Sequence, residues 1–160
     1  MCGITGYYSP TDFFSSDDLE KMTNMVIHRG PDAEGFYYNG IIGLGHRRLS
    51  IIDLSKAGNQ PMYSADKRYV IVYNGEVYNF REIANELNSV TGNKKIDFVS
   101  SSDTEVMVEA FARWGPDCVN KFNGMFAIAI YDTQENELHL FRDRLGIKPV
   151  FYYWEHVKQI

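Results

Sequence analysis

The chain has 160 residues, of which 44% are apolar and 14% aromatic, and its formal net charge is −5. These values are typical of a single globular domain with a real core, and they exclude a disordered chain, which would be less apolar and more charged. The negative charge argues against nucleic acid or an anionic membrane as the main partner. The N-terminus lacks the segments of a signal peptide, and two cysteines do not make a disulfide framework, so the sequence predicts a cytoplasmic protein.

The first part of the chain combines strand-like segments with one helix-like segment. Residues 2–8 are rich in Ile, Thr and Tyr and predict a short strand. Residues 15–18 carry the Ser and Asp side chains that begin helices, and apolar residues follow at helical spacing until a Gly-Pro pair at residues 30–31. Residues 35–38 and 41–52 predict two further strands.

The middle of the chain carries a strong strand signal and two helix starts. Residues 69–73 predict a strand, and Asn74-Gly75 after it predicts a tight hairpin turn, because both residue types tolerate positive φ. Asn79 predicts the cap of a following helix. Residues 102–105 fit a capping box at the start of another helix.

The last part predicts a second hairpin and a final strand. Residues 125–131 and 138–141 form the predicted hairpin, joined near Asn136, and residues 150–154 form the predicted last strand. Cys118 falls in a predicted short helix and is interpreted as structural. Strands at both ends with helices between them predict an α+β or layered α/β domain.

Cys2 is the first candidate for chemistry. The small residue at position two permits removal of Met1, which would leave Cys2 with both a thiol and a free α-amine. An α-amine has a pKa of about 7.7–8.0, so one residue would supply nucleophile and base together. The alternative is that Cys2 is a small apolar residue in an edge strand, and its position alone favours that alternative.

Four other residues have both a structural and a functional interpretation. Asn74 and Gly75 fit a tight turn, and such a turn could also present an amide and an N–H to a developing oxyanion. Arg48 fits a solvated charged face, or a fork that holds a substrate carboxylate. Asp103 fits the first turn of a helix for dipole reasons, and it could also receive an ammonium group.

The sequence contains no pattern for a metal or nucleotide site. Its four histidines have no metal-ligand spacing, and Gly43-Leu44-Gly45 lacks the third glycine of a dinucleotide fingerprint. There is no phosphate-binding P-loop. We therefore expect no metal and no cofactor in this domain.

Seven sequence blocks follow one another along the chain. They are MCGITGYY at the start, HRGPDAEG at 28–35, GHRRLSIIDLS at 45–55, NGEVYN at 74–79, SSDTE at 101–105, GMFAIAIYD at 124–132 and RDRLGIKPVFY at 142–152. In this order they closely resemble the glutaminase domain of asparagine synthetases, over essentially the whole chain.

That family belongs to the class II glutamine amidotransferases. The resemblance implies an N-terminal-nucleophile fold, a four-layer αββα sandwich with two antiparallel sheets between helical layers. It implies that Cys2 attacks the side-chain amide of glutamine, with an oxyanion hole made by the Asn74 side chain and the Gly75 N–H.

The resemblance also assigns the substrate contacts. It implies that Arg48 grips the glutamine α-carboxylate, and that Asp103 and Glu76 hold the α-ammonium group. If Met1 stays attached, the α-amine of Cys2 is locked in a peptide bond, and such a chain is expected to be inactive.

The resemblance assigns residues 1–160 to one amidotransferase domain that ends before the family's last strand. The expected partners are glutamine and a C-terminal synthetase domain absent from this chain, which would use ATP and Mg²⁺ to make asparagine from the released ammonia. No nucleic acid and no membrane are expected, and a homodimer is left open. Two alternatives also stay open: the same glutaminase chemistry with a different acceptor, and a non-catalytic regulatory domain of the same fold.

Overall fold

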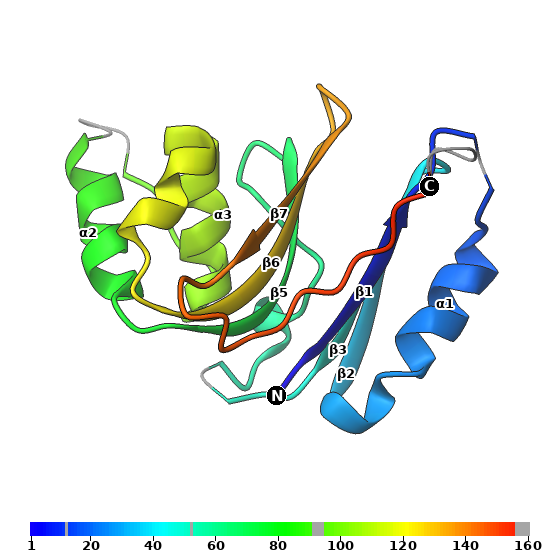
Figure 1. Ribbon diagram of the computed structural model, residues 1–160. Helices are drawn as coiled ribbons and strands as arrows, with labels where there is room; N and C mark the ends of the chain where they lie inside the picture. The colour runs from blue at the N-terminus through cyan, green and yellow to red at the C-terminus, as the bar shows by residue number, and fades with distance from the viewer. Residues whose placement is uncertain (12, 52, 91–94, 156–160) are drawn as a thin grey trace.

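The computed structural model describes residues 1–11, 13–51, 53–90 and 95–155, which form an α+β domain with two antiparallel sheets (Figure 1). The three-stranded sheet has the order β1-β3-β2, and these strands span Gly3–Tyr8, Ile42–Arg48 and Ala33–Tyr38. The four-stranded sheet has the order β4-β5-β6-β7, and its strands span Met62–Tyr63, Tyr69–Val77, Gly124–Asp132 and Glu137–Arg142.

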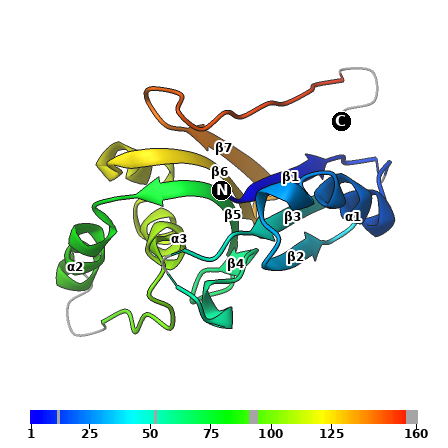
Figure 2. The same cartoon turned by 90° about the horizontal axis from the view of Figure 1, so that it is seen from below.

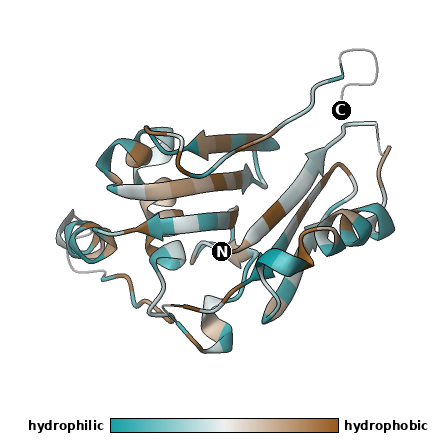
Figure 3. Ribbon diagram, turned by 60° about the horizontal axis from the view of Figure 1, so that its bottom comes forward, coloured by the Kyte–Doolittle hydropathy of each residue, from teal (hydrophilic) through white to brown (hydrophobic). Residues whose placement is uncertain are grey.

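Helices cover one face of each sheet. The α-helices are α1 at Ser16–Asn24, α2 at Phe80–Val90 and α3 at Asp103–Trp114, and short 3₁₀ helices span Ile27–Arg29, Lys56–Gly58 and Gly115–Lys121. Helix α1 packs on β1 and β3, α3 packs on β5 and β4, and α2 lies beside α3 (Figures 1 and 2). In Figure 3, α1 is largely hydrophilic, whereas β6 is mostly apolar. No helix of the described residues is long and apolar enough to cross a bilayer.

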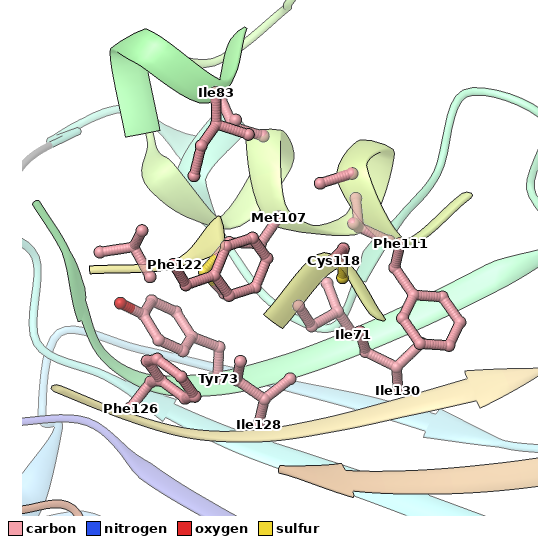
Figure 4. Close-up of a cluster of buried hydrophobic side chains, with 14 of the residues drawn as sticks. Ile71, Tyr73, Ile83, Met107, Phe111, Cys118, Phe122, Phe126, Ile128 and Ile130 are labelled. Carbon is pink, nitrogen blue, oxygen red and sulfur yellow. The ribbon is translucent and has the colours of Figure 1, made fainter. Parts of the chain in front are cut away.

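Two apolar clusters hold these layers together. The larger lies between the four-stranded sheet and helices α2 and α3, and Figure 4 shows Tyr73 in it beside residues such as Ile71 and Phe122. The smaller cluster lies between the two sheets and contains Ile42, Leu44, Val70, Val72, Ala129 and Tyr131. Side chains alternate between the faces of a strand. The odd residues of β5 therefore face the helices and the even ones face the other sheet.

The predicted helix after residue 15 is confirmed, and local chemistry explains its start. The Ser15 side chain accepts from the Asp18 N–H, and the Asp18 carboxylate accepts from the Ser15 N–H at 3.0 Å. This capping box satisfies N–H groups that have no partner within the helix. Leu19 and Thr23 are buried on the inner face of the helix.

The predicted hairpin at Asn74-Gly75 is wrong. Strand β5 runs through both residues, which pair with Ala127 and Phe126 of β6. A long ladder with β6 outweighs the turn preference of two residues, because strand propensity depends strongly on tertiary context. The glycine serves close packing instead: a Cβ at Gly75 would strike the Met125 carbonyl oxygen and lie 2.7 Å from the Phe126 Cα.

The predicted hairpin near Asn136 is confirmed. Strands β6 and β7 pair antiparallel, from Ala127 opposite Arg142 to Asp132 opposite Glu137. Asn136 adopts a φ of 56°, in the left-handed region that Asn tolerates better than most residues.

The predicted capping box at residues 102–105 does not form. Ser102 is the residue before α3, but its side chain makes no capping hydrogen bond. The Glu105 carboxylate reaches back further than expected and accepts from the N–H groups of Val99 at 2.8 Å and Ser100 at 2.6 Å. The Glu105 carboxylate therefore fixes the segment that precedes α3, rather than capping the helix itself.

Asn79 directly precedes α2, but its side chain bonds to another part of the chain. Its amide donates to the Lys121 carbonyl and accepts from the Asn123 N–H, at 2.9 and 2.8 Å. Asn79 thus joins the start of α2 to the chain that leads into β6.

The predicted last strand at residues 150–154 is wrong. Residues 150–155 have no regular structure and join neither sheet, and Phe151 and Tyr152 are largely exposed. Apolar, β-prone residues form a strand only where a neighbouring edge accepts their hydrogen bonds. The strand predicted at 41–52 begins at Ile42 and ends at Arg48. Ile52 and residues 156–160 lie outside the described residues.

His46 of β3 is fully buried between the two sheets. Its Nε2 lies 3.2 Å from the Tyr73 carbonyl oxygen, which can only accept, so Nε2 carries the hydrogen. Its Nδ1 has no partner among the described residues. Burial lowers the pKa of His46 from 6.5 to about 4, because the charged ring is poorly solvated there.

Acid is therefore expected to destabilise the domain through His46. The unfolded chain takes up this proton below about pH 6.5 and the folded chain only near pH 4. The contribution of His46 to the free energy of unfolding is thus fully present above pH 6.5, and about 3 kcal/mol of it is lost as the pH drops to 4. Urea denaturation across this range should show a smaller acid loss in His46→Gln than in wild type. His28→Gln, at an exposed histidine, is the control. Equal acid losses in wild type and His46→Gln would contradict this account.

Candidate active site

Cys2 lies half-buried just before β1, beside the end of β3. The Leu49 N–H points to its Sγ at 3.4 Å, and Sγ lies 3.7 Å from the Leu49 carbonyl oxygen. The Arg29 Nε–H donates to the Cys2 carbonyl at 3.1 Å. These contacts fix the backbone of Cys2 and hold its thiol at a defined place.

The segment before β2 holds this end of the three-stranded sheet together. The Asp32 N–H donates to the Arg48 carbonyl at 3.0 Å, and the Asp32 carboxylate accepts from the Ser50 N–H at 2.8 Å. Arg29 donates to the Cys2 carbonyl. The short segment before β2 is therefore hydrogen-bonded both to the segment that contains Cys2 and to the end of β3, which contains Arg48.

The Gly75 N–H points away from β6. In an antiparallel ladder, each pair of facing residues either exchanges two hydrogen bonds or exchanges none. Phe126, which faces Gly75, uses its N–H and its carbonyl for Asp143, at 3.2 and 2.9 Å, and so turns both groups away from β5. Gly75 and Phe126 are therefore a pair without hydrogen bonds.

The same edge of β5 presents the N–H groups of Tyr73, Gly75 and Val77. Tyr73 donates to the Gln60 side chain at 2.6 Å, and Val77 donates to the Asp103 carboxylate at 3.0 Å. Among the described residues, the Gly75 N–H between them has no acceptor. It is a fixed donor that is available to a ligand.

The side chains of Asn74 and Glu76 lie on the face of β5 that is turned toward the three-stranded sheet. The odd-numbered residues of β5 lie on the other face. Asn74 is buried, yet its side chain makes no hydrogen bond in the part of the chain that the structure describes. Both residues lie on the strand that carries the free Gly75 N–H, so an amide, a carboxylate and a backbone donor lie close together.

Arg48 is buried at the end of β3, and its guanidinium group is fixed by the loop that follows. Nη1 donates to the Ser55 carbonyl and to the Asn59 side chain, each at 2.7 Å, and Nη2 donates to the Asp53 carbonyl. A guanidinium group has five N–H donors, so two remain available. No carboxylate of the described residues forms an ion pair with Arg48.

Asp53 links that loop to the segment before α3. Its carboxylate accepts from the N–H groups of Ser55 at 2.7 Å and Ser101 at 2.9 Å. Hydrogen bonds from Ser55 and then Ser101 lower the pKa of Asp53 to about 2, because they stabilise the charged form. Arg48 is thereby held indirectly against the start of α3.

Asp103 begins α3 and is buried. Its Oδ2 accepts from the Tyr73 hydroxyl at 2.8 Å and from the Val77 N–H at 3.0 Å. Burial raises the pKa of Asp103 above the usual value for a carboxyl group, although these hydrogen bonds oppose the shift. Burial also raises the pKa of Tyr73, and the adjacent Asp103 carboxylate adds to that shift. The Tyr73 hydroxyl is therefore a stable donor.

All six residues singled out from the sequence line one cavity. They are Cys2, Arg48, Asn74, Gly75, Glu76 and Asp103. Met1 also lines this cavity and extends into an adjoining pocket formed with His28, Arg29, Pro31 and Leu49.

Other residues of the cavity were not singled out from the sequence. They are Asp53, which anchors the Arg48 loop, Gln60, which holds Tyr73, and Lys148, which reaches in from the loop after β7. Asp53 and Lys148 lie within the blocks 45–55 and 142–152, so the blocks contained them without indicating their roles. Gln60 belongs to no block, and no pattern in the sequence marks it.

The cavity combines a thiol, a guanidinium group, the ammonium group of Lys148, the three carboxylates of Asp53, Glu76 and Asp103, and a free backbone donor. The guanidinium group suits a carboxylate ligand and the carboxylates suit an ammonium group, so the set fits an α-amino acid. The thiol is a potential nucleophile near donors that could stabilise an oxyanion. Among the described residues, no group of three or more His, Cys, Asp or Glu side chains is placed to hold a metal ion.

Comparison with known proteins agrees with this chemistry. Residues 1–160 match the family model described as a glutamine amidotransferase domain. The chain belongs to the class II glutamine amidotransferase family.

Relatives of this amidotransferase domain include synthetases and an amidase. It is 39% identical to the putative glutamine-hydrolyzing asparagine synthetase 2 of Methanocaldococcus jannaschii, over 97% of this chain and 32% of that protein. It is 37% identical to the glutamine-hydrolyzing asparagine synthetase 1 of Bacillus subtilis and to the amidase chyE of Penicillium rubens, in each case over 95% of this chain and 24% of the relative. The domain thus spans about a quarter to a third of the length of these relatives.

Gly75→Ala is expected to destabilise the amidotransferase domain. The new Cβ would collide with the Met125 carbonyl and the Phe126 backbone and force β5 from β6, and such overpacking typically costs about 1–3 kcal/mol. Urea denaturation measures the loss. Asn74→Ala is the control, because position 74 already has a Cβ and its amide has no hydrogen-bond partner among the described residues, so it should stay within about 1 kcal/mol of wild type. A Gly75→Ala protein as stable as wild type would contradict this prediction, because it would show that β5 and β6 can move apart at this position without a loss of stability.

Proposed function

We propose that this domain hydrolyses the side-chain amide of glutamine to glutamate and ammonia through a thioester on Cys2. The observation that carries the proposal is the cavity, in which the Cys2 thiol shares one space with Arg48, Asp103 and the free Gly75 N–H. Arg48 would bind the glutamine α-carboxylate through its two available N–H groups. Asp103, with Glu76, would bind the α-ammonium group. Family membership supports glutamine as the substrate.

The reaction needs a free N-terminus on Cys2. After removal of Met1, the α-amine takes the thiol proton and the thiolate attacks the amide carbon. The Asn74 amide and the Gly75 N–H donate to the oxyanion, which is charged only in the intermediate. The carbon–nitrogen bond then breaks, the α-amine returns the proton to the leaving ammonia, and water hydrolyses the thioester to release glutamate and regenerate the thiol.

We also propose that the domain has the N-terminal-nucleophile fold, a four-layer αββα sandwich. The arrangement that supports this assignment is the pair of antiparallel sheets, with α1 on one outer face and α2 and α3 on the other (Figure 1). In the proposed mechanism the nucleophile is the residue that leads into the first strand, and Cys2 directly precedes β1.

In a longer protein, we propose that the ammonia serves asparagine synthesis in a C-terminal synthetase domain outside residues 1–160, which would hold ATP and Mg²⁺. Relatives named as glutamine-hydrolyzing asparagine synthetases support this proposal. A cytoplasmic location fits it. A different acceptor is the second candidate, because proteins named as amidases match equally large parts of the chain. A non-catalytic domain is less well supported, because Cys2 is retained in the cavity.

Cys2→Ala is expected to abolish glutamine hydrolysis while glutamine still binds, because only the nucleophile is lost. A chain with an uncleavable residue before Cys2 should be equally inactive, because an amide nitrogen is not a base. Glutamate release measures the activity, and intact mass after treatment with an electrophilic glutamine analogue should show one addition, at Cys2. Cys118→Ala is the control and should keep its activity. Hydrolysis by the Cys2→Ala protein would refute the proposed mechanism.

As the pH falls, glutamine binding is expected to weaken. The weakening should begin at a higher pH than it would if the ammonium group were bound by a carboxyl group of ordinary pKa. The raised pKa of Asp103 means that its carboxylate is protonated early as the pH falls, and a protonated Asp103 no longer attracts the ammonium group. Calorimetric titration with glutamine in a Cys2→Ala background, between about pH 4 and 7, measures this loss.

The matched variant is Asp103→Asn, which keeps acceptors for the Tyr73 hydroxyl and the Val77 N–H. It should bind glutamine about ten- to a hundredfold more weakly at pH 7, with a flatter dependence on pH. The effect of His46 on stability is common to both proteins and cancels in the comparison. Identical pH profiles for the two proteins would exclude Asp103 as the ammonium site.

A further inference from the structure

Lys148 is a buried cation of the cavity that the proposed mechanism does not use. Its side chain is only 4% exposed, and its Nζ lies 2.7 Å from Met1 Sδ. No carboxylate of the described residues forms an ion pair with it. Met1, Cys2 and Lys148 line the same cavity, so the ammonium group shares the space of the proposed nucleophile.

The loop after β7 is built to hold Lys148 in place. The Asp143 carboxylate accepts from the N–H groups of Ile147 and Lys148, each at 2.8 Å, and from the Phe126 N–H of β6. Burial alone would raise the pKa of Asp143, but these backbone donors lower it, so the group stays charged. Gly146 turns the loop with a φ of 67°, which favours glycine.

This placement is unfavourable for stability alone. Lysine is almost never fully buried unless it is paired, and a thioether sulfur is a weak acceptor that does not replace water or a carboxylate. Lys148 has no carboxylate partner among the described residues and lines the same cavity as the Cys2 thiol, so its burial calls for a functional explanation.

The charges around the cavity indicate what that function is. Arg48 and Asp53 are each bonded to the loop after β3, and Arg48 faces the proposed substrate carboxylate. Glu76 and Asp103 add two carboxylates that face the same space. The adjoining pocket, which Met1 also lines, contributes His28 and Arg29, and the Arg29 Nε–H donates to the Cys2 carbonyl. Nearby carboxylates oppose the ionisation of a thiol, and a nearby cation favours it.

We propose that Lys148 is a positioning residue for the nucleophile: after Met1 is removed, its ammonium group lies beside the Cys2 thiol and stabilises the thiolate against the carboxylates of Glu76 and Asp103. The thiol proton goes to the Cys2 α-amine, and Lys148 takes no part in that proton transfer. This inference rests on the proposed function, since it takes Cys2 as the nucleophile and first residue.

Alkylation of Cys2 by iodoacetamide tests the inference without requiring glutamine turnover. Chains that begin at Cys2, verified by intact mass, are treated at a series of pH values, and the modified residue is located by peptide mass. The variants are Lys148→Met and Lys148→Gln, which remove the charge, Lys148→Arg, which keeps it, and Lys21→Met, which removes an exposed lysine of α1 as a control. Cys118 is fully buried, so its alkylation reports unfolding.

We expect the two neutral variants to alkylate Cys2 about tenfold more slowly than wild type at pH 7, and at the same rate near pH 10, where every protein carries the thiolate. Lys148→Arg and Lys21→Met should follow wild type. Equal profiles in all proteins would overturn the inference, as would rates lowered equally at every pH, which would indicate access rather than charge. If both neutral variants expose Cys118, Lys148 is a folding residue and the inference fails.

The same proteins separate this inference from the proposed function. A wild-type protein that alkylates as expected but does not release glutamate from glutamine would refute the proposed function alone. Glutamine hydrolysis together with identical alkylation profiles for wild type and Lys148→Met would refute only the role of Lys148.

Discussion

The candidate site depends on the hydrogen-bonding alternation of β5. Gly75 faces Phe126 in a pair without hydrogen bonds, so its N–H turns into the cavity instead of into the sheet. The same register directs Asn74 and Glu76 toward the other sheet. A shift of one residue would give the Gly75 N–H to β6 and turn both side chains toward the helices, because side chains alternate with a period of two. The tight contact of Gly75 with β6 resists such a shift.

The charged groups proposed to bind the ligand also connect separate elements of the fold. Asp103 connects β5 to the start of α3, and Asp53 connects the loop after β3 to the chain before α3. Arg48 is tied to that same loop. Each charged group is thus oriented by backbone donors or acceptors before any ligand arrives, which lowers the reorganisation needed for binding and catalysis. The cost is that a substitution at one such connection disturbs the position of its neighbours.

Sequence reasoning succeeded at two features whose deciding chemistry is local. The Ser15 cap of α1 and the turn at Asn136 involve residues next to one another, and both are confirmed. It failed at Asn74-Gly75, because a ladder with a strand distant in sequence overrides the turn preference. The convergence of the six candidate residues on one cavity followed from family resemblance, since no local pattern brings them together. Lys148 was missed because its burial arises from a loop that Asp143 folds against the N-terminus.

The place of Met1 in the cavity has a consequence for any measurement of rate. Under the proposed mechanism an unprocessed chain is a zymogen, and its own first residue is the blocking group. The processed fraction, rather than the protein concentration, then sets the number of working sites in a preparation. A mixed preparation would show a low apparent kcat at an unchanged KM, because the inactive chains contribute protein but no turnover. Two preparations of identical sequence could therefore differ in specific activity solely through the completeness of N-terminal processing.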